Sequence, residues 1–222
     1  GKSIIDGSDL EEARDKVLMG LKREGMAIGD EEKRILAYHE AGHALMAISM
    51  PRADPIHKVT IVPRGRAMGV TQQLPETDVH VYQQAYMADR LAVLLAGRAS
   101  EMLVFNTKTS GAEADLREAT AIAHRMVSSW GMGDDLGPVS FDSDTGTVFL
   151  GEDLGRARPY GEQLANAIDR EVQQILSRSL AQARSLLAER RVALDAVAAR
   201  LIEKEELTGD EVKHLAGLVQ QA

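Results

Sequence analysis

Two histidines, His39 and His43, lie four residues apart, and Glu40 directly follows the first of them. Residues at positions i and i+4 lie on one face of an α-helix, so both imidazoles can bind a single ion. Glu40 lies about 100° further round the same turn, near enough to reach a water on that ion but not in line with the two ring nitrogens. The spacing therefore predicts a helix that carries a metal site.

The chemistry of such a site follows from the three side chains. A zinc ion binds imidazole nitrogen readily, and a coordination position left open to water lowers the pKa of that water to about 7. A carboxylate beside the water can take its proton and pass it to a leaving amine. This arrangement is suited to hydrolysis of a peptide bond, in which metal-activated water attacks the carbonyl and Glu40 is the general base.

An exposed helix could carry the same three residues by chance, as part of a solvated face. The flanking residues argue against this, because they are large and apolar or small: Ile35, Leu36, Ala41, Gly42, Ala44, Leu45, Met46, Ala47 and Ile48. A helix of this composition is buried. Burial of two imidazoles and a carboxylate without partners is costly, so a bound metal is the more economical explanation.

Composition excludes several classes of protein. The 222 residues are enough for one large domain or two small ones, and the net charge of −8 without a Lys/Arg-rich run argues against a nucleic-acid partner. The absence of cysteine excludes a disulfide framework and a cysteine-based zinc site, and it fits a reducing compartment. No apolar run approaches the roughly 20 residues that span a bilayer, and no signal peptide is evident, so we expect the chain as given to be soluble.

The first half of the chain reads as helices around a small sheet. We expect an N-terminal helix from residue 9, a linker over 25–29, and a helix from Asp30 to near Pro51. Alternating β-branched residues predict a strand over 56–62, and residues 67–72 can return beside it. Gly69, between Met68 and Val70, marks a close approach by another backbone, which in a protease would be a substrate strand added to the sheet edge.

The remaining sequence is mostly helical. We predict a helix over 77–105 with Glu101 on its apolar face, and a helix that opens with a capping box from Ser110 to Glu113 and carries Asp115 on its apolar face. A glycine-rich loop over 131–155 contains a possible short hairpin, and helices over 160–189, 191–202 and after 208 follow. The fold class is mainly α, with a small β-sheet beside the metal helix and a C-terminal helical bundle. One peptidase domain over 1–222 would comprise an N-terminal helix and linker (1–29), a zinc-binding part (30–155) and the bundle (156–222).

A catalytic zinc usually has three protein ligands. The metzincin pattern requires Gly at position 46 and His at 49, where this chain has Met46 and Ser49, so that class is excluded. Downstream candidates for the third ligand are His57, Asp78, His80, Asp89, Glu101 and Asp115. His57 fits an exposed histidine at a strand end, and Asp78 fits an acid at a helix start. Glu101 and Asp115 alone combine a helix with an apolar face, and the residues by themselves do not rank the two.

The chain resembles the protease domain of the FtsH family of membrane-anchored, ATP-dependent zinc metalloproteases. The resemblance extends from about residue 9 to 215, through the stretches 9–17, 30–44, 54–65, 95–98, 109–115, 130–132, 149–151 and 201–205. This ordered set is far more specific than the histidine motif alone. Two positions depart from the family pattern: Ala114 stands where Asn is usual, and Met102 where a second Glu is frequent.

The resemblance implies a ligand set and roles. His39, His43 and Asp115 would bind one Zn²⁺ per chain, Glu40 would be the general base, and Glu101 would orient a ligand histidine by accepting its other N–H. Ala114 lacks the side-chain amide with which Asn would make a supporting hydrogen bond.

The resemblance also implies partners. The full-length protein would carry transmembrane segments and an AAA ATPase before Gly1, would form a homohexamer at the cytoplasmic side of the bacterial inner membrane, and would use ATP only through that ATPase. Its substrates would be unfolded cytosolic and membrane proteins, cleaved with loose sequence preference. Two alternatives remain: another zinc hydrolase, such as an aminopeptidase or a deformylase-like enzyme, and a non-catalytic, zinc-stabilised oligomerisation module. Retention of Glu40 speaks against the second, because a structural zinc site needs no adjacent base.

Overall fold

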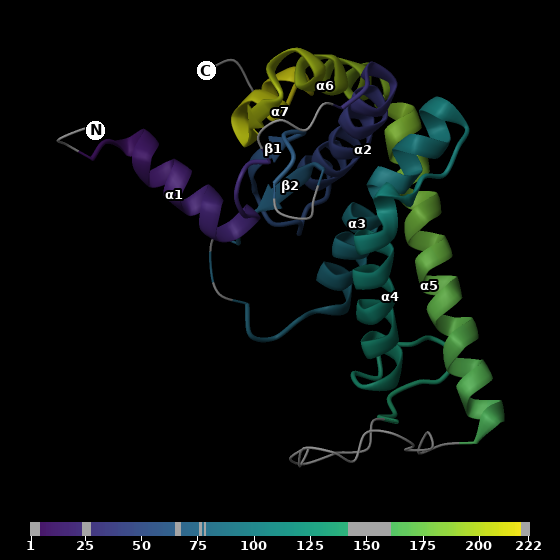
Figure 1. The fold of residues 1–222 in the computed structure, drawn as a ribbon. Coiled ribbons are helices and arrows are strands. Elements are labelled where there is room, and N and C mark those ends of the chain that lie inside the picture. Colours follow the sequence, from purple (N-terminus) through teal and green to yellow (C-terminus); the bar gives the residue numbers. More distant parts are fainter. Residues whose placement is uncertain are drawn as a thin grey trace.

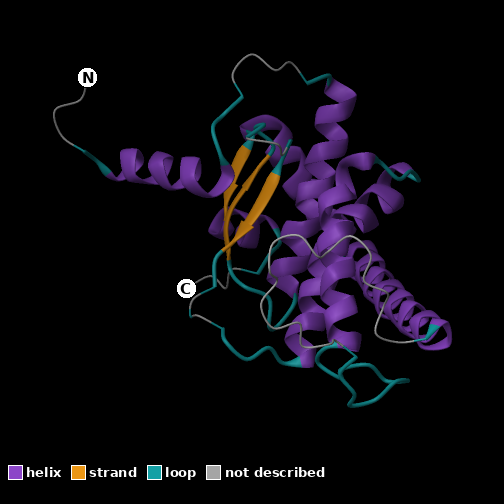
Figure 2. Ribbon diagram, turned by 60° about the horizontal axis from the view of Figure 1, so that its bottom comes forward, coloured by secondary structure: helices purple, strands orange, loops and turns teal. Residues whose placement is uncertain are grey.

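The computed structural model describes residues 5–23, 28–64, 68–75, 77, 79–141 and 161–218. Within these ranges the chain is mainly helical with one small antiparallel sheet, which confirms the predicted fold class (Figures 1 and 2). The elements are, in chain order, α1 (Gly7–Met19), α2 (Asp30–Ser49), β1 (Ile56–Thr60), β2 (Val70–Gln73), α3 (Gln84–Phe105), the short 3₁₀ helix η1 (Ser110–Ala112), α4 (Glu113–Ser128), α5 (Glu162–Glu189), α6 (Arg191–Lys204), β3 (Glu206–Thr208) and α7 (Gly209–Leu215).

Helix α2 runs through the interior of the molecule. Residues 37–47 are buried without interruption, as its apolar and small residues predict. The helix ends at Ser49, close before Pro51, as expected. Its predicted N-cap was wrong: Gly29 is the capping residue, without a side-chain hydrogen bond, and Asp30 is the first helical residue. The carboxylate of Asp30 lies in the first turn, where its negative charge interacts favourably with the positive end of the helix dipole.

The sheet has the strand order β2-β1-β3, and both pairs are antiparallel. Val59 of β1 pairs with Thr71 of β2 on one side and with Leu207 of β3 on the other. Strand β2 is therefore an edge strand, and it packs beside α2. Strand β3 was not predicted. A short hairpin was expected between residues 139–141 and 147–150, but residues 139–141 form no strand, and residues 147–150 lie outside the described residues.

Helix α3 begins at Gln84 and not at residue 77, so the predicted start was wrong. The apolar residues before it do not belong to a buried helical face, because Val81 is 83% exposed. The rings of Tyr82 and Tyr86 are stacked with their centroids 6.1 Å apart. Gln83 adopts an extended conformation and ends this non-helical stretch.

Two hydrophobic clusters form the core, and α3 contributes to both. The first cluster joins α2 and α3 to the sheet, α6, α7 and the C-terminal half of α5. The second joins α3 to α4 and the N-terminal half of α5. Figure 1 shows α3, α4 and α5 running side by side below the end of the molecule that carries α2 and α6. The C-terminal helices thus pack largely on earlier helices, α6 against α2 and α5 against α3 and α4.

Helix α1 projects from the rest of the molecule (Figure 1). Its attachment is a group of charges at the sheet: the buried Asp15 lies 2.6 Å from Nζ of Lys58 and 3.5 Å from the guanidinium of Arg64, which in turn contacts Glu206. Among the helices in the described ranges, none has the length and hydropathy needed to cross a membrane.

Candidate metal centre

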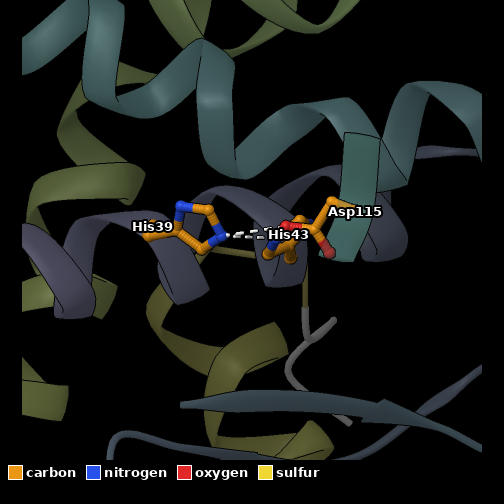
Figure 3. A group of neighbouring side chains, drawn as sticks. All are labelled: His39, His43 and Asp115. Atoms are coloured by element: carbon orange, nitrogen blue, oxygen red, sulfur yellow. Dashed lines mark hydrogen bonds and ion pairs between the residues drawn. The ribbon is translucent and has the colours of Figure 1, made fainter. Parts of the chain in front are cut away.

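Three side chains from two helices converge on one point (Figure 3). His39 and His43 come from α2, and Asp115 comes from the first turn of α4. The Nε2 atoms of the two histidines lie 3.0 Å apart, and Oδ2 of Asp115 lies 3.1 Å from Nε2 of His39 and 3.4 Å from Nε2 of His43. These three are the group of potential metal ligands found within the described part of the chain.

Hydrogen bonds on the far side of each ring determine which nitrogen is free. Nδ1 of His39 lies 2.8 Å from Oε1 of Glu101, and Nδ1 of His43 lies 2.8 Å from the carbonyl oxygen of Val93. Both partners are acceptors, so each Nδ1 donates its proton and each neutral ring turns a lone pair on Nε2 inward. As long as both rings are neutral, three acceptors therefore meet without a donor, and a metal ion or an added proton is needed to satisfy them.

The spacing of these atoms fits zinc. Two ligand atoms at about 2.0–2.1 Å from a tetrahedral ion lie roughly 3.3 Å from one another. The three observed separations are 3.0, 3.1 and 3.4 Å. Two imidazoles and one carboxylate, with a fourth position left open, are also the donor set of a catalytic zinc site.

In the metal-free protein a proton takes the place of the cation. Burial lowers the pKa of His39, but its hydrogen bonds to Asp115 and Glu101 outweigh that effect and raise the pKa to about 10. Burial raises the pKa of Asp115, and hydrogen bonds from His39 and His43 reverse this and hold it below its usual range. The side chain of Asp115 is 23% exposed, so its carboxylate faces the cleft and is not enclosed in the core.

Glu40 lies beside this group and its carboxylate is held in place. Oε2 accepts a hydrogen bond of 2.7 Å from the hydroxyl of Thr71 on the edge strand. A Cβ atom at Gly69 would lie 2.7 Å from Oε1, so only glycine leaves space for the carboxylate here. Burial raises the pKa of Glu40, although His43, His39 and Thr71 counteract the shift. A carboxylate of this kind is suited to proton transfer near neutral pH.

A cleft of about 1080 Å³ gives access to the three converging side chains. Residues 68–71, at and just before the start of β2, form one side of the cleft, and the first turn of α4, with Ala114 and Asp115, forms another. Met68, Gly69 and Val70, the predicted substrate-strand residues, therefore lie at the cleft, and Gly69 lies next to Glu40.

Comparison with known proteins places the chain in a family. The model of peptidase family M41 matches residues 26–215. The chain belongs to peptidase family M41. The M41 chain is 51% identical to the ATP-dependent zinc metalloprotease FtsH 2 of Salinibacter ruber, over 97% of its own length and 32% of the relative's. It is 48% identical to an ATP-dependent zinc metalloprotease FtsH of Nitrosococcus oceani and 46% identical to FtsH 4 of Sorangium cellulosum.

These relatives support the prediction that the M41 chain resembles FtsH proteases and is a metalloprotease module. The M41 chain spans about a third of the length of each of them, with 96–97% of its own residues aligned.

Gly97 of the M41 chain belongs to the site although sequence reasoning did not select it. A Cβ atom there would lie 2.5 Å from Nε2 of His39 and from Nε2 of His43. Helix α3 thus approaches the two rings with bare backbone. The sequence does contain a signal for this, namely a glycine in the middle of a strongly helical stretch. Glycine there destabilises the helix by about 1 kcal/mol relative to alanine, so its presence indicates close packing that leaves no space for a side chain.

The other candidates for a third ligand lie away from the three converging side chains or contact a different atom. His57 on β1 contacts the guanidinium of Arg14, and Asp89 accepts a hydrogen bond of 3.1 Å from the backbone N–H of Arg52. His80 lies exposed on the loop before α3. Asp78 lies outside the described residues. Glu101 contacts His39, but at Nδ1, on the ring edge opposite Asp115.

The predicted capping box from Ser110 to Glu113 does not form. Instead Thr109 precedes η1, and its hydroxyl accepts a hydrogen bond from the backbone N–H of Gly111. Ala114, where the family usually has Asn, is exposed at the cleft.

Proposed function

We propose that this chain is a zinc-dependent endopeptidase. One observation carries the proposal: the two Nε2 atoms of His39 and His43 and a carboxylate oxygen of Asp115 converge at the spacing of zinc ligands, beside the held carboxylate of Glu40. A site of this composition needs a cation, and the neighbouring carboxylate supplies a base that a purely structural site would not require.

Each side chain has a role in peptide hydrolysis. His39, His43 and Asp115 would hold the ion, with Glu101 and the carbonyl of Val93 fixing the two imidazoles. Zinc bound there would act as a Lewis acid toward the peptide carbonyl and would lower the pKa of water. Glu40 accepts the proton of the attacking water and donates it to the leaving amine. The raised pKa of Glu40 favours both transfers at neutral pH.

The edge strand supports the choice of an endopeptidase. An extended substrate can pair with backbone groups of Met68, Gly69 and Val70 at the cleft, which fixes the peptide bond without reading its side chains. Such pairing does not require a free amino terminus, in contrast to an aminopeptidase. Loose sequence preference follows from backbone recognition.

The larger protein is proposed by analogy with relatives that are about three times as long and are named ATP-dependent. In it this module would follow an ATPase and transmembrane segments and would assemble as a homohexamer. It would degrade unfolded cytosolic and membrane proteins at the cytoplasmic side of the bacterial inner membrane. ATP would act only through the ATPase.

The test is metal analysis of the purified chain combined with cleavage of casein whose amino termini are blocked. The expected result is about one zinc per chain and cleavage that a chelator abolishes and zinc restores. Glu40→Gln is expected to retain the metal and lose cleavage. Cleavage that persists in Glu40→Gln would exclude Glu40 as the base, and cleavage of only unblocked substrate would favour an aminopeptidase.

A further inference from the structure

We propose that Thr109 is a positioning residue that couples the two halves of the metal centre, an inference that rests on the proposed zinc site. Thr109 lies in the loop that follows α3, after Asn106, which takes a left-handed conformation with φ of 51° and turns the chain back. The loop returns to Glu101, one turn before the end of α3, and then continues into η1 and α4.

On one side, Thr109 holds both oxygens of Glu101. Its hydroxyl donates to Oε1 at 2.9 Å, and its backbone N–H donates to Oε2 at 2.9 Å. Oε1 is also the atom that accepts from Nδ1 of His39 at 2.8 Å. Glu101 is fully buried, so its direction depends on these protein donors. Thr109 therefore sets the orientation of the carboxylate that orients His39.

On the other side, the same hydroxyl controls the segment that leads to Asp115. It accepts a hydrogen bond of 3.1 Å from the backbone N–H of Gly111, which makes Thr109 the N-cap of η1. Helix α4 follows η1 directly, and Asp115 is its third residue. One hydroxyl thus joins the acceptor behind His39 to the start of the helix that carries Asp115.

The side chain and its surroundings keep this hydroxyl in place. Threonine is branched at Cβ, so its χ1 rotamers are restricted and the direction of the hydroxyl is well defined. Arg98 donates to the carbonyl oxygen of Thr109 at 2.8 Å, and its Nε lies 3.9 Å from Oε2 of Glu101. Without the hydroxyl, Oε1 of Glu101 would lose the donor that holds it from the side of the loop, and its position would depend on the bond from His39 that it is meant to orient.

The experiment compares Thr109→Val, which removes the hydroxyl at nearly constant shape, with Thr109→Ser, which restores it. Zinc affinity is measured by competition with a chromophoric chelator, and the visible spectrum of the cobalt-substituted protein reports ligand geometry. Thr109→Val is expected to weaken zinc binding about 10- to 100-fold, which is the range typical for loss of a group that supports a metal ligand. It is also expected to alter the cobalt spectrum. Thr109→Ser is expected to stay within about threefold of the original protein.

Thr120→Val is the matched control, because Thr120 is exposed on α4 and, among the described residues, its hydroxyl bonds to the carbonyl of Leu116 within the same helix. It should leave zinc affinity unchanged. Thr109→Ala replaces the valine variant if circular dichroism shows that Thr109→Val does not fold.

A double-mutant cycle with Glu101→Gln separates positioning from packing. If Thr109 acts through Glu101, the effect of Thr109→Val on zinc affinity shrinks in the Glu101→Gln background. Equal zinc affinity of Thr109→Val and the original protein, or strictly additive effects in the cycle, would overturn the inference. These outcomes leave the proposed function intact, whereas absence of zinc and cleavage in the original protein would overturn that function itself.

Discussion

Gly97 faces Nε2 of His43 with no side chain between them, and a Cβ atom at Gly97 would lie 2.5 Å from that nitrogen. Atoms this close must move, so Gly97→Ala is expected to displace the imidazoles and weaken zinc binding at least tenfold. The same change should stabilise helix α3 itself by about 1 kcal/mol, because alanine is the better helix former. Zinc titration together with thermal unfolding of the metal-free protein distinguishes the two effects.

Gly7→Ala is the control for this substitution, since among the described residues, its two chain neighbours aside, no atom lies within 4 Å of the added Cβ. If Gly97→Ala bound zinc as tightly as Gly7→Ala does, this would contradict the close approach of Gly97 to the two imidazole rings.

Thr71 is expected to set the acid limit of activity. Burial raises the pKa of Glu40, and the hydrogen bond from Thr71 opposes that shift. Thr71→Val removes the hydroxyl that donates to Glu40, and valine is as compatible with a β-strand as threonine is. The pKa of Glu40 should therefore rise further. Because the base works in its ionised form, the acid limb of the pH profile of kcat/KM should move to higher pH. Thr71→Ser should restore it, and an unmoved profile in Thr71→Val would refute this coupling.

Zinc binding is expected to release a proton from His39. The pKa of His39 is about 10 in the metal-free protein, so the ring is protonated at neutral pH and must lose that proton to bind the ion. Between about pH 6 and 7.5, zinc affinity should therefore rise about tenfold per pH unit. Calorimetry in buffers of different ionisation enthalpy measures the released protons. His214→Gln, at an exposed position on α7, should release the same number.

The same pKa predicts how the metal-free protein responds to alkali. A folded-state pKa of about 10 against 6.5 for the unfolded chain means that protonated His39 stabilises the fold fully below pH 6.5. This contribution to the free energy of unfolding should decline as the pH rises from 6.5 through 10. Metal-loaded protein should not show the decline, because the ion has replaced the proton.

Asp115 and Glu101 are expected to differ in their effect on zinc content. Asp115 faces Nε2 of both histidines, whereas the ring nitrogen that Glu101 contacts is Nδ1 of His39. Asp115→Ala should therefore remove most of the zinc, and Glu101→Gln should reduce affinity less. Glu118→Gln, which changes a surface acid paired with Arg90, should retain zinc fully. The reverse order for the first two variants would show that Glu101 is the ligand.

The pair His39 and His43 could be predicted from the sequence because their spacing matches the helical repeat and their flanks are apolar. The choice between Glu101 and Asp115 could not, since both are acids on apolar helix faces. What separates them is the nitrogen of His39 that each one faces, which is a property of the three-dimensional arrangement.

The secondary structure, too, could be predicted only in part from the sequence. Helix α2 was predictable from its local pattern, but β3 has three residues and owes its existence to pairing with β1. The start of α3 was misjudged because exposed residues such as Val81 mimic a buried periodicity.

The position of the metal centre has a consequence for unfolding. His39 and His43 belong to the helix that builds the first hydrophobic cluster, and Asp115 belongs to a helix of the second. An ion bound by all three would cross-link the two clusters and close the long chain segment between His43 and Asp115, which reduces the entropy of the unfolded chain. Loaded protein should therefore lose both clusters in one cooperative transition, and release of the ion would let α4 open locally without disrupting α2.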